Sequence, residues 1–189
     1  RDEGYAEHGR DDMSEEASDG SGDRRLRALC DLSARLEQGV GDEALGAWLD
    51  SAVELLAADR IAAFTTGPDG ALVLLQGRAL RHALSRAERE ELSRTLVRSA
   101  VSEGRTAAFE HGAEEAPESV RSLGILSAFA VPLWRGRPRW GAPAQGALYV
   151  DVRSARSLLR AWSREYVEVA AALLALALAP AGESPNEER

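Results

Sequence analysis

Three histidines and one cysteine are the side chains best suited to nucleophilic catalysis or to binding a transition metal. His8, His82 and His111 lie far apart in the sequence, and no His-Glu-x-x-His motif or paired-histidine spacing occurs. Cys30 has no second cysteine with which to form a disulfide or a Cys-x-x-Cys site, and it lies on the apolar face of a predicted helix. We therefore expect Cys30 to be a small buried side chain, and we expect no catalytic residues, no metal site and no cofactor.

Two other features could bind a ligand. Three arginines lie between two tryptophans in the loop 134–140. This loop either contacts an anion or a partner or forms a solvated hairpin tip with arginines stacked on tryptophans. His111 ends a predicted strand and is either a ligand contact, a haem ligand or a loop histidine. The chain contains no lysine, so a Schiff-base lysine and the lysine of a phosphate-binding loop are both excluded.

The acidic charge lies at the two ends of the chain. Residues 1–23 contain nine acidic residues and two arginines, and residues 180–189 contain three acidic residues and one arginine. The ends therefore carry −7 and −2 of the total charge of −8, and the residues between them about +1. A nearly neutral body gives no electrostatic reason to expect direct contact with nucleic acid.

This distribution also predicts the domain organisation. Residues 1–23 are acidic and poor in large apolar residues, which favours a disordered tail or linker. Residues 24–180 form the expected domain, and 181–189 the linker to a following module. No secretory signal is visible, and the longest apolar run, 169–179, is too short to span a bilayer. We expect a cytoplasmic location without a membrane contact.

The stretch 119–151 predicts the centre of the fold, with a short helix, a strand over 126–134, a long turn and a strand over 146–152. Side chains alternate along a strand, so both strands are apolar on two faces and belong inside a sheet that is covered on both sides. In the first strand we expect Phe129, Val131 and Leu133 to point one way, and Ala128 and Ala130 the other. In the second strand we expect Leu148, Val150 and Val152 on one face, and Ala147 and Tyr149 on the other.

The remaining segments supply the covering layers. Helical spacing of apolar residues predicts helices over 24–38, 43–56, 86–102 and 163–179, and apolar runs predict strands over 60–66, 71–76 and 106–110. Expected end signals are N-caps at Asp42 and Ser163, a capping box of Ser85 with Glu88, and a helix end before Gly104. This order of elements is typical of an α+β fold with an antiparallel sheet and helices on both faces.

The central stretch also resembles the C-terminal half of a GAF domain, a small-molecule sensor and dimerisation module. The resemblance rests on Ser119-Val120-Arg121, Gly124-Ile125, Ser127, Val131-Pro132-Leu133 and Gly146-Ala147-Leu148-Tyr149-Val150-Asp151. It implies a sheet of about six strands, with the first and last helices packed together on one face and mediating dimers. It also implies a ligand pocket on the other face, roofed by the segment before Ser127. We expect Phe109, Ser127, Phe129 and Tyr149 to line this pocket; the alternative is that all four are ordinary core residues.

The resemblance does not extend to the specialised GAF chemistries. Reductases of this type use several cysteines, bilin-binding members carry a cysteine in the ligand half, and cyclic-nucleotide-binding members need a lysine. The resemblance thus implies a non-catalytic sensing and dimerisation domain of a bacterial signal-transduction protein, with an unknown small-molecule ligand. The alternatives are a structural dimerisation linker with no ligand and the input domain of a histidine kinase or cyclase.

Two further patterns bear on partners. Gly182-Glu183-Ser184-Pro185 resembles the opening of the AAA+ ATPase domain in bacterial transcription activators, although a plain linker fits the same residues. In the last helix, apolar residues repeat at spacings of four and three, which predicts a homodimer through a heptad seam. The seam residues are Trp162, Tyr166, Val169, Leu173 and Leu176. Packing of the same residues on the domain's own sheet is the alternative.

Overall fold

The computed structural model of the protein describes residues 27, 28, 30–32, 34, 41–80, 82–109, 122–134, 139, 141–154 and 164–178. The predicted tail 1–23, the linker 181–189, His8, His111, Trp162, Ser163 and most of the loop 134–140 lie outside these residues. In chain order the labelled elements are α2 (Asp42–Leu55), β1 (Arg60–Thr66), β2 (Leu72–Ala79), β3 (His82–Ala83), α3 (Arg86–Glu90), α4 (Arg94–Glu103), β4 (Ala107–Phe109), β5 (Ser127–Leu133), β6 (Gly146–Val152) and α7 (Arg164–Leu178).

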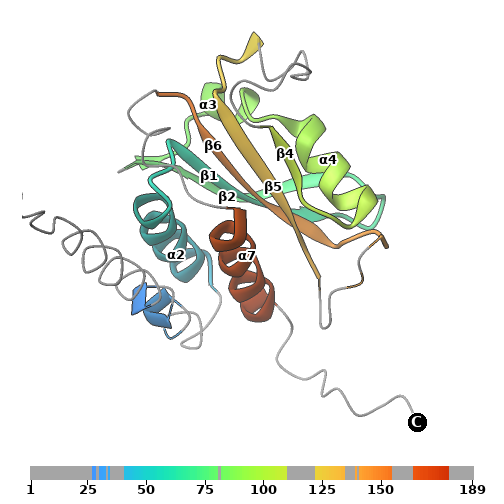
Figure 1. Ribbon diagram of the computed structural model, residues 1–189, viewed down its shortest axis with the longest axis horizontal. Helices are drawn as coiled ribbons and strands as arrows, with labels where there is room; N and C mark the ends of the chain where they lie inside the picture. The colour runs from blue at the N-terminus through green and yellow to red at the C-terminus, as the bar shows by residue number, and fades with distance from the viewer. Residues whose placement is uncertain are drawn as a thin grey trace, which may run out of the picture.

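The strands form one six-stranded sheet in the order β3-β2-β1-β6-β5-β4, and every neighbouring pair is antiparallel. Helices α2 and α7 cover one face of the sheet, and α3 and α4 lie on the other (Figure 1). The predicted α+β fold with a GAF-like antiparallel sheet and helices on both faces is confirmed. The two-residue strand β3 was not predicted, because two residues carry no readable periodicity.

The hairpin of β1 and β2 turns at the predicted Gly-Pro-Asp-Gly sequence. The amide of Gly67 donates to the carbonyl of Ala71 at 2.8 Å, and the amide of Ala71 donates to the Asp69 carboxylate at 3.0 Å. Gly70 has a φ of 77°, a conformation that glycine adopts without steric cost. The turn therefore brings 60–66 and 72–79 into antiparallel register, with a bulge between Ala63 and Phe64.

Strands β5 and β6 are buried along their whole length, as expected of strands covered on both faces. Their alternation separates two apolar cores, and the predicted division of side chains is confirmed. The core beneath α2 and α7 contains Phe129, Val131, Leu133, Leu148 and Val150. The core beneath α3 and α4 contains Ala128, Ala130, Ala147 and Tyr149, together with Ala62 and Phe64 of β1.

Helix α2 buries the predicted apolar stripe, but its N-terminus differs from the prediction. The stripe comprises Leu45, Trp48, Leu49, Ala52, Val53 and Leu56, all buried. The N-cap is Gly41 rather than Asp42, which is the first helical residue. The Asp42 carboxylate still lies at the positive end of the helix dipole, and the Asp42 carbonyl accepts a hydrogen bond from the Gln76 side chain of β2 at 2.6 Å.

The predicted helix 86–102 is wrong as a single element, since the structure divides it into α3 and α4. The predicted capping box is present: the amide of Glu88 donates to the Ser85 hydroxyl, and the amide of Ser85 donates to the Glu88 carboxylate. Helix α4 ends at Gly104 with a φ of 56°, as expected. The break between the helices coincides with a long-range contact from Arg60, which sequence periodicity does not register.

The prediction for Cys30 is also wrong, because its side chain is exposed. Leu32, two residues further along, is 3% exposed and packs in the core beneath α2 and α7 instead. Residues two apart point in different directions around a helix, so an error in the assigned face exchanges a buried residue for an exposed one.

Candidate functional site

A buried pair of opposite charges lies on the α3/α4 face of the sheet. Arg60 opens β1 and stands directly opposite Asp151 of the neighbouring strand β6. The Nε atom of Arg60 donates to both carboxylate oxygens of Asp151 at 3.1 Å, and Nη2 donates to Oδ2. Arg60 is 2% exposed and Asp151 is 1% exposed, so the pair is shielded from solvent. This bidentate contact fixes the orientation of the guanidinium.

Tyr149 completes the centre from the same strand. Residues two apart in a strand share a face, which places the Tyr149 ring beside the Asp151 carboxylate. The Tyr149 hydroxyl donates to Asp151 Oδ2 at 2.8 Å, and the residue is fully buried. Asp151 therefore accepts hydrogen bonds from a cation and from a neutral donor, which is how a buried carboxylate is retained without loss of stability.

The surroundings shift the pKa values of all three groups. Burial opposes the charge on Arg60, but the hydrogen bonds and negative charge of Asp151 outweigh burial and raise the pKa of the guanidinium. Burial also raises the pKa of the Asp151 carboxyl, while the hydrogen bonds and positive charge of Arg60 oppose that rise. Burial raises the pKa of Tyr149 well above its ordinary value, so the hydroxyl stays protonated and serves as a donor.

Arg60 also connects the sheet to the end of α3. Its Nη1 atom donates to the carbonyl of Glu88 at 3.3 Å, and Nη2 donates to the carbonyl of Glu91 at 3.3 Å. The last carbonyls of a helix have no partner within the helix, so an arginine placed there satisfies them and complements the negative helix end. Arg60 therefore stabilises the point at which the predicted single helix divides.

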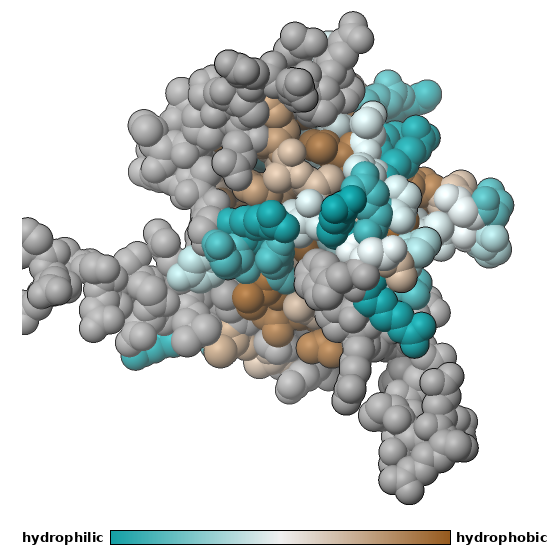
Figure 2. Space-filling view, turned by 45° about the vertical axis from the view of Figure 1, so that its right-hand side comes forward, coloured by the Kyte–Doolittle hydropathy of each residue, from teal (hydrophilic) through white to brown (hydrophobic). Residues whose placement is uncertain are grey.

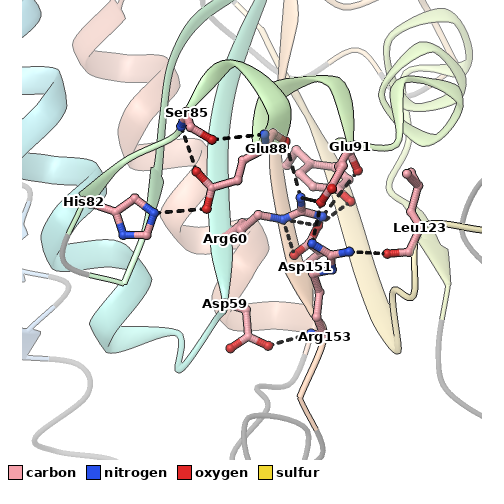
Figure 3. A network of polar contacts seen from close by, with 10 residues as sticks. Asp59, Arg60, His82, Ser85, Glu88, Glu91, Leu123, Asp151 and Arg153 are labelled. Carbon is pink, nitrogen blue, oxygen red and sulfur yellow. Dashed lines mark hydrogen bonds and ion pairs between the residues drawn. The ribbon is translucent and has the colours of Figure 1, made fainter.

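A second arginine extends the network toward solvent (Figure 3). Arg153 follows β6; its Nη1 donates to Glu91 Oε2 at 2.6 Å and its Nη2 donates to the carbonyl of Leu123 at 2.5 Å. The Arg153 amide donates to the Asp59 carboxylate at 2.6 Å. The same Glu91 oxygen lies 3.4 Å from Nη1 of Arg60. One connected set of charges thus joins the ends of β1 and β6, the α3–α4 corner and the segment before β5.

The structure does not bring the four predicted pocket residues together. Phe109 and Tyr149 lie in the core on the α3/α4 face, whereas Phe129 lies in the core beneath α2 and α7. The Ser127 hydroxyl donates to the carbonyl of Phe109 at 3.2 Å and thereby joins β5 to β4. Ser127 also lines a narrow space beneath α2 and α7 together with Phe129. Ligand contact by these four residues stays a prediction.

Sequence reasoning missed the charged members of the network. A signal was available, because Asp151 is a charged residue near the end of an apolar strand that was assigned to the interior of a sheet, and Arg60 opens the apolar run 60–66. Charged residues in such strands need a partner, and each could have been the other's partner. No comparable signal pointed to Glu91 or Arg153, whose contacts depend on how the α3–α4 corner folds back on the sheet.

Helix α7 presents a second candidate surface. The side chains that it buries against the sheet are Val167, Ala170, Ala171 and Leu174. The stripe predicted as a dimer seam is a different one: Tyr166 and Leu173 are partly buried, Val169 is 45% exposed and Leu176 is 69% exposed. On the face of the molecule that Figure 2 shows, hydrophobic residues (brown) are exposed between hydrophilic ones (teal). Tyr166 and Leu173 still pack against the core beneath α2 and α7, whereas Val169 and Leu176 are left largely in solvent.

An open pocket of about 290 Å³ lies between the end of α7 and the adjacent ends of the central strands. Its lining includes Leu75, Leu133, Trp134, Ala175 and Leu178. In the part of the chain that the structure describes, no group of three or more His, Cys, Asp or Glu side chains is placed to hold a metal ion. Among the described helices, none combines the length and the apolar character needed to cross a membrane.

Comparison with solved structures finds the same architecture in domains of low sequence identity. One is a GAF domain assigned to a sensor histidine kinase of Pseudomonas syringae pv. tomato, with 18% identity, a TM-score of 0.54 and coverage of 84% of this chain and 91% of that chain. Another is the phycoerythrobilin-bound GAF domain of a cyanobacterial phytochrome, with 16% identity, a TM-score of 0.54 and coverage of 84% and 96%. A third is the A. Aeolicus nlh2 GAF domain in an inactive state, with 11% identity, a TM-score of 0.56 and coverage of 82% and 96%.

Comparison by sequence finds no match: no family model matches the chain, and no curated protein matches it. The structural likeness nevertheless extends over more than four-fifths of this chain and over nearly the whole of each of the three neighbours. The chain has the fold of a GAF domain.

Proposed function

We propose that this GAF-fold chain is a non-catalytic, cytoplasmic sensory domain of a bacterial signal-transduction protein, and that it dimerises through α7. A fold does not by itself fix a function, so the proposal depends on particular surfaces of this chain. Residues 24–180 are the sensory unit in this proposal, and 181–189 lead to the module that the sensor controls. The similar solved domains from a sensor histidine kinase and from phytochromes support a role in signalling.

The observation that carries the proposal is the presence of two separate apolar stripes on α7. One stripe packs against the sheet and consists of the buried residues Val167, Ala170 and Leu174. The other includes Val169 and Leu176, which together expose two large apolar side chains on one short helix. A helix that is needed only for its own domain requires one apolar stripe, whereas a second stripe in heptad spacing suits a parallel partner helix. A homodimer would cover it.

A polar contact links the two faces of the sheet and suits a sensor. Thr106, at the entrance to the edge strand β4, donates its hydroxyl to Glu168 of α7 at 2.6 Å. Arg164 of the same helix donates to the same carboxylate oxygen at 2.7 Å. Helix α4 ends at Glu103, three residues before Thr106, so this contact gives a shift of α4 a short route to α7. Ligand binding can change the output only if the ligand binds two such arrangements with different affinity.

Within this proposal the ligand binds on the α3/α4 face, where Phe109 and Tyr149 are the best placed of the four predicted contacts. Ser127 and Phe129 belong to the opposite face and would respond to the ligand through the sheet. Small side chains such as Ala128 and Ala130 line the sheet beneath α4, so a modest displacement of that helix would open space for a small molecule.

The output module that we favour is an AAA+ ATPase of a transcription activator, on the basis of Gly182-Glu183-Ser184-Pro185. The input domain of a histidine kinase is the second candidate, and the similarity to a domain assigned to such a kinase supports it. In both cases the sensor biases the output and performs no chemistry itself. The parent sequence decides between them, because the ATPase requires a G-x-x-x-x-G-K-[ST] phosphate loop after Arg189.

Light scattering tests the dimer. The wild type is expected to have twice the monomer mass, and Leu173→Glu with Leu176→Glu is expected to give a monomer, because charged side chains are not tolerated in a buried heptad seam. Val169→Glu and Val73→Glu form a matched pair, since these valines are 45% and 47% exposed but only Val169 lies on the seam. Val169→Glu should weaken the dimer, and Val73→Glu should leave it intact. A wild type that is monomeric at every concentration would contradict the dimer.

Thermal stability in the presence of a metabolite panel tests the sensor. A ligand at a hundred times its dissociation constant should add about 2.7 kcal/mol to the free energy of unfolding. A domain that serves only as a structural dimerisation linker would dimerise but would show no stabilisation by any compound of the panel.

A further inference from the structure

We propose that Glu91 occupies, as an internal substitute, the binding position of a small carboxylate ligand between Arg60 and Arg153. The inference rests on the proposed sensory function and adds to it the chemical class of the ligand. It begins from an unusual placement: one carboxylate from the α3–α4 corner lies between two arginines that come from the ends of adjacent strands (Figure 3).

The hydrogen-bond lengths show that Glu91 fills this position incompletely. A single oxygen, Oε2, contacts both arginines, at 2.6 Å from Nη1 of Arg153 and at 3.4 Å from Nη1 of Arg60. Charge-assisted N–H to O contacts are normally about 2.7 to 2.9 Å long. Nη1 of Arg60 therefore makes only long contacts, because its other acceptor, the Glu88 carbonyl, lies at 3.3 Å. A carboxylate that is not attached to the corner could place one oxygen on each arginine.

Burial makes this an effective site for an anion. The side chain of Arg60 is 3% exposed, so a charge that contacts it is poorly screened by water. The side chains of Glu91 and Arg153 are 40% and 35% exposed, so solvent already reaches the outer part of the position. A small ligand can therefore enter from solvent and contact a buried guanidinium at the inner end.

The balance of charge requires the ligand to replace the Glu91 carboxylate rather than to bind beside it. Asp151 already neutralises Arg60, and Glu91 neutralises Arg153. A further anion beside Glu91 would leave one negative charge without a partner, which is costly near a buried site. Replacement of Glu91 by the ligand keeps the balance, and the displaced carboxylate moves into solvent at low cost because it is already partly exposed.

Such an exchange would also report binding to the rest of the domain. Glu91 joins the α3–α4 corner to Arg153, and the Arg153 side chain also holds the carbonyl of Leu123 in the segment before β5. Release of the Glu91 side chain removes the contact of the corner with Arg153 and leaves the corner held by the bonds from Arg60 to the carbonyls of Glu88 and Glu91, at 3.3 Å each. The ligand keeps the two arginines together. The α3/α4 layer would therefore loosen from the sheet on the face proposed to sense the ligand.

Chemical rescue tests the proposal, with acetate as the probe and chloride at equal ionic strength as the reference. In Glu91→Ala the position is empty, and acetate at roughly ten times its dissociation constant should raise Tm by about 3 to 6 °C. Glu90→Ala removes the neighbouring carboxylate, which is 68% exposed and pairs with Arg86 on the surface of α3. It should respond to acetate no more than the wild type. Glu91→Ala combined with Arg153→Gln should lose the response.

Glu91→Gln provides a second variant, which keeps the shape of the corner and removes the competing charge. It should respond to acetate at lower concentration than the wild type does. Equal responses of Glu91→Ala and Glu90→Ala would overturn the proposal, and so would stabilisation by inorganic phosphate without stabilisation by acetate. A failed rescue in a protein that dimerises and is stabilised by another compound would refute this ligand class and leave the sensory function standing. A monomer without any stabilising compound would refute the sensory function.

Discussion

The two faces of the sheet are built on different principles, although the same strands supply both. On the α2/α7 face, β5 and β6 present large apolar side chains such as Phe129, Val131 and Leu148. The side chains that α2 and α7 pack against them are also apolar. On the α3/α4 face, the same strands present alanines, one tyrosine and Asp151. Apolar packing is non-directional, whereas the contacts of Arg60 with Asp151 are directional. The first face therefore contributes mainly stability, and the second specifies where its helices lie.

Under the proposed sensory function, this difference gives the two faces separate roles. A closely packed apolar layer has few alternative arrangements, so α2 and α7 move together with the sheet. A layer held by a few charged contacts can change when one contact is replaced by a ligand. The α3/α4 face is thus the better candidate for the sensor, and α7 for the element that passes its state to a partner.

The largest effect is expected from removing one charge of the buried pair. Asp151→Ala leaves the Arg60 guanidinium buried and without its carboxylate, which should lower the free energy of unfolding by about 3 to 5 kcal/mol. Urea unfolding measures the change. The control is Asp50→Ala, because the Asp50 carboxylate is 52% exposed in its pair with Arg78. That variant should lose less than about 1 kcal/mol. Similar losses in the two variants would remove the distinction between the faces.

A cavity on the apolar face should cost somewhat less. Leu148→Ala removes a fully buried side chain beneath α2 and α7, and a loss of about 2 to 5 kcal/mol is expected. Ile61→Val is the conservative control on the same face and should lose about 0.5 to 1.5 kcal/mol. Because this face does not hold the α3–α4 corner, acetate should affect neither variant differently from the wild type. A change in acetate response would contradict the independence of the two faces.

Overfilling the opposite face probes the small residues there. Ala147→Leu, next to Leu148 in the sequence but facing α4, adds volume to a fully buried position and should cost about 1 to 3 kcal/mol. Calorimetry gives the change in Tm. If the α3/α4 layer moves as proposed, the loss lies at the low end of this range and below that of Leu148→Ala. A loss larger than that of Leu148→Ala would show that the α3/α4 layer is the more rigid one.

The smallest effect concerns pH at the rim of the polar face. Hydrogen bonds from Ser85 and His82 lower the pKa of Glu88 to about 2. The stability that Glu88 provides is therefore present above pH of about 4.5 and is lost as pH falls toward 2. The pKa of His82 is raised by its hydrogen bond to Glu88, so the stability from His82 is present below pH of about 6.5 and is lost as pH rises through the raised value.

Paired unfolding curves test both signs. The difference between the wild type and Glu88→Gln should shrink between pH 4.5 and 2, and the difference between the wild type and His82→Ala should shrink above neutral pH. Glu90→Ala, on the exposed side of α3, should show neither trend. Differences that stay constant with pH would mean that the contact between His82 and Glu88 contributes nothing.

Much of the fold was predictable because it follows from local patterns. The alternation in 126–134 and 146–152 assigned each side chain to its face, and the Gly-Pro-Asp-Gly turn located the first hairpin. The spacing of Leu45, Trp48 and Leu49 located the helix and the stripe that it buries. Each of these signals involves residues within a few positions of one another. The backbone geometry that each signal reflects also depends only on residues that are close in the sequence.

The candidate site was predictable only in part. Phe109 and Tyr149 were assigned to the face where the structure places them, but Phe129 was grouped with them although its own alternation puts it on the other face. The arrangement around Glu91 requires three distant segments to meet, and the sequence of each segment is unremarkable by itself. The position of Cys30 shows the same limit at the level of one helix turn, since the assigned face was wrong.

The sequence by itself thus determined five of the six strands, the two faces of β5 and β6, the turn chemistry and the apolar spacing along α7, because periodicity and backbone preferences are local properties. Tertiary structure alone decided that one helix becomes α3 and α4, that Arg60 meets Asp151 across β1 and β6, and that Glu91 lies between two arginines. These contacts join residues about 30 to 90 positions apart, as in the pairs of Arg60 with Glu91 and with Asp151. Their energy depends on burial and on the alignment of donors with acceptors, which exist only after the sheet and its covering layers have assembled.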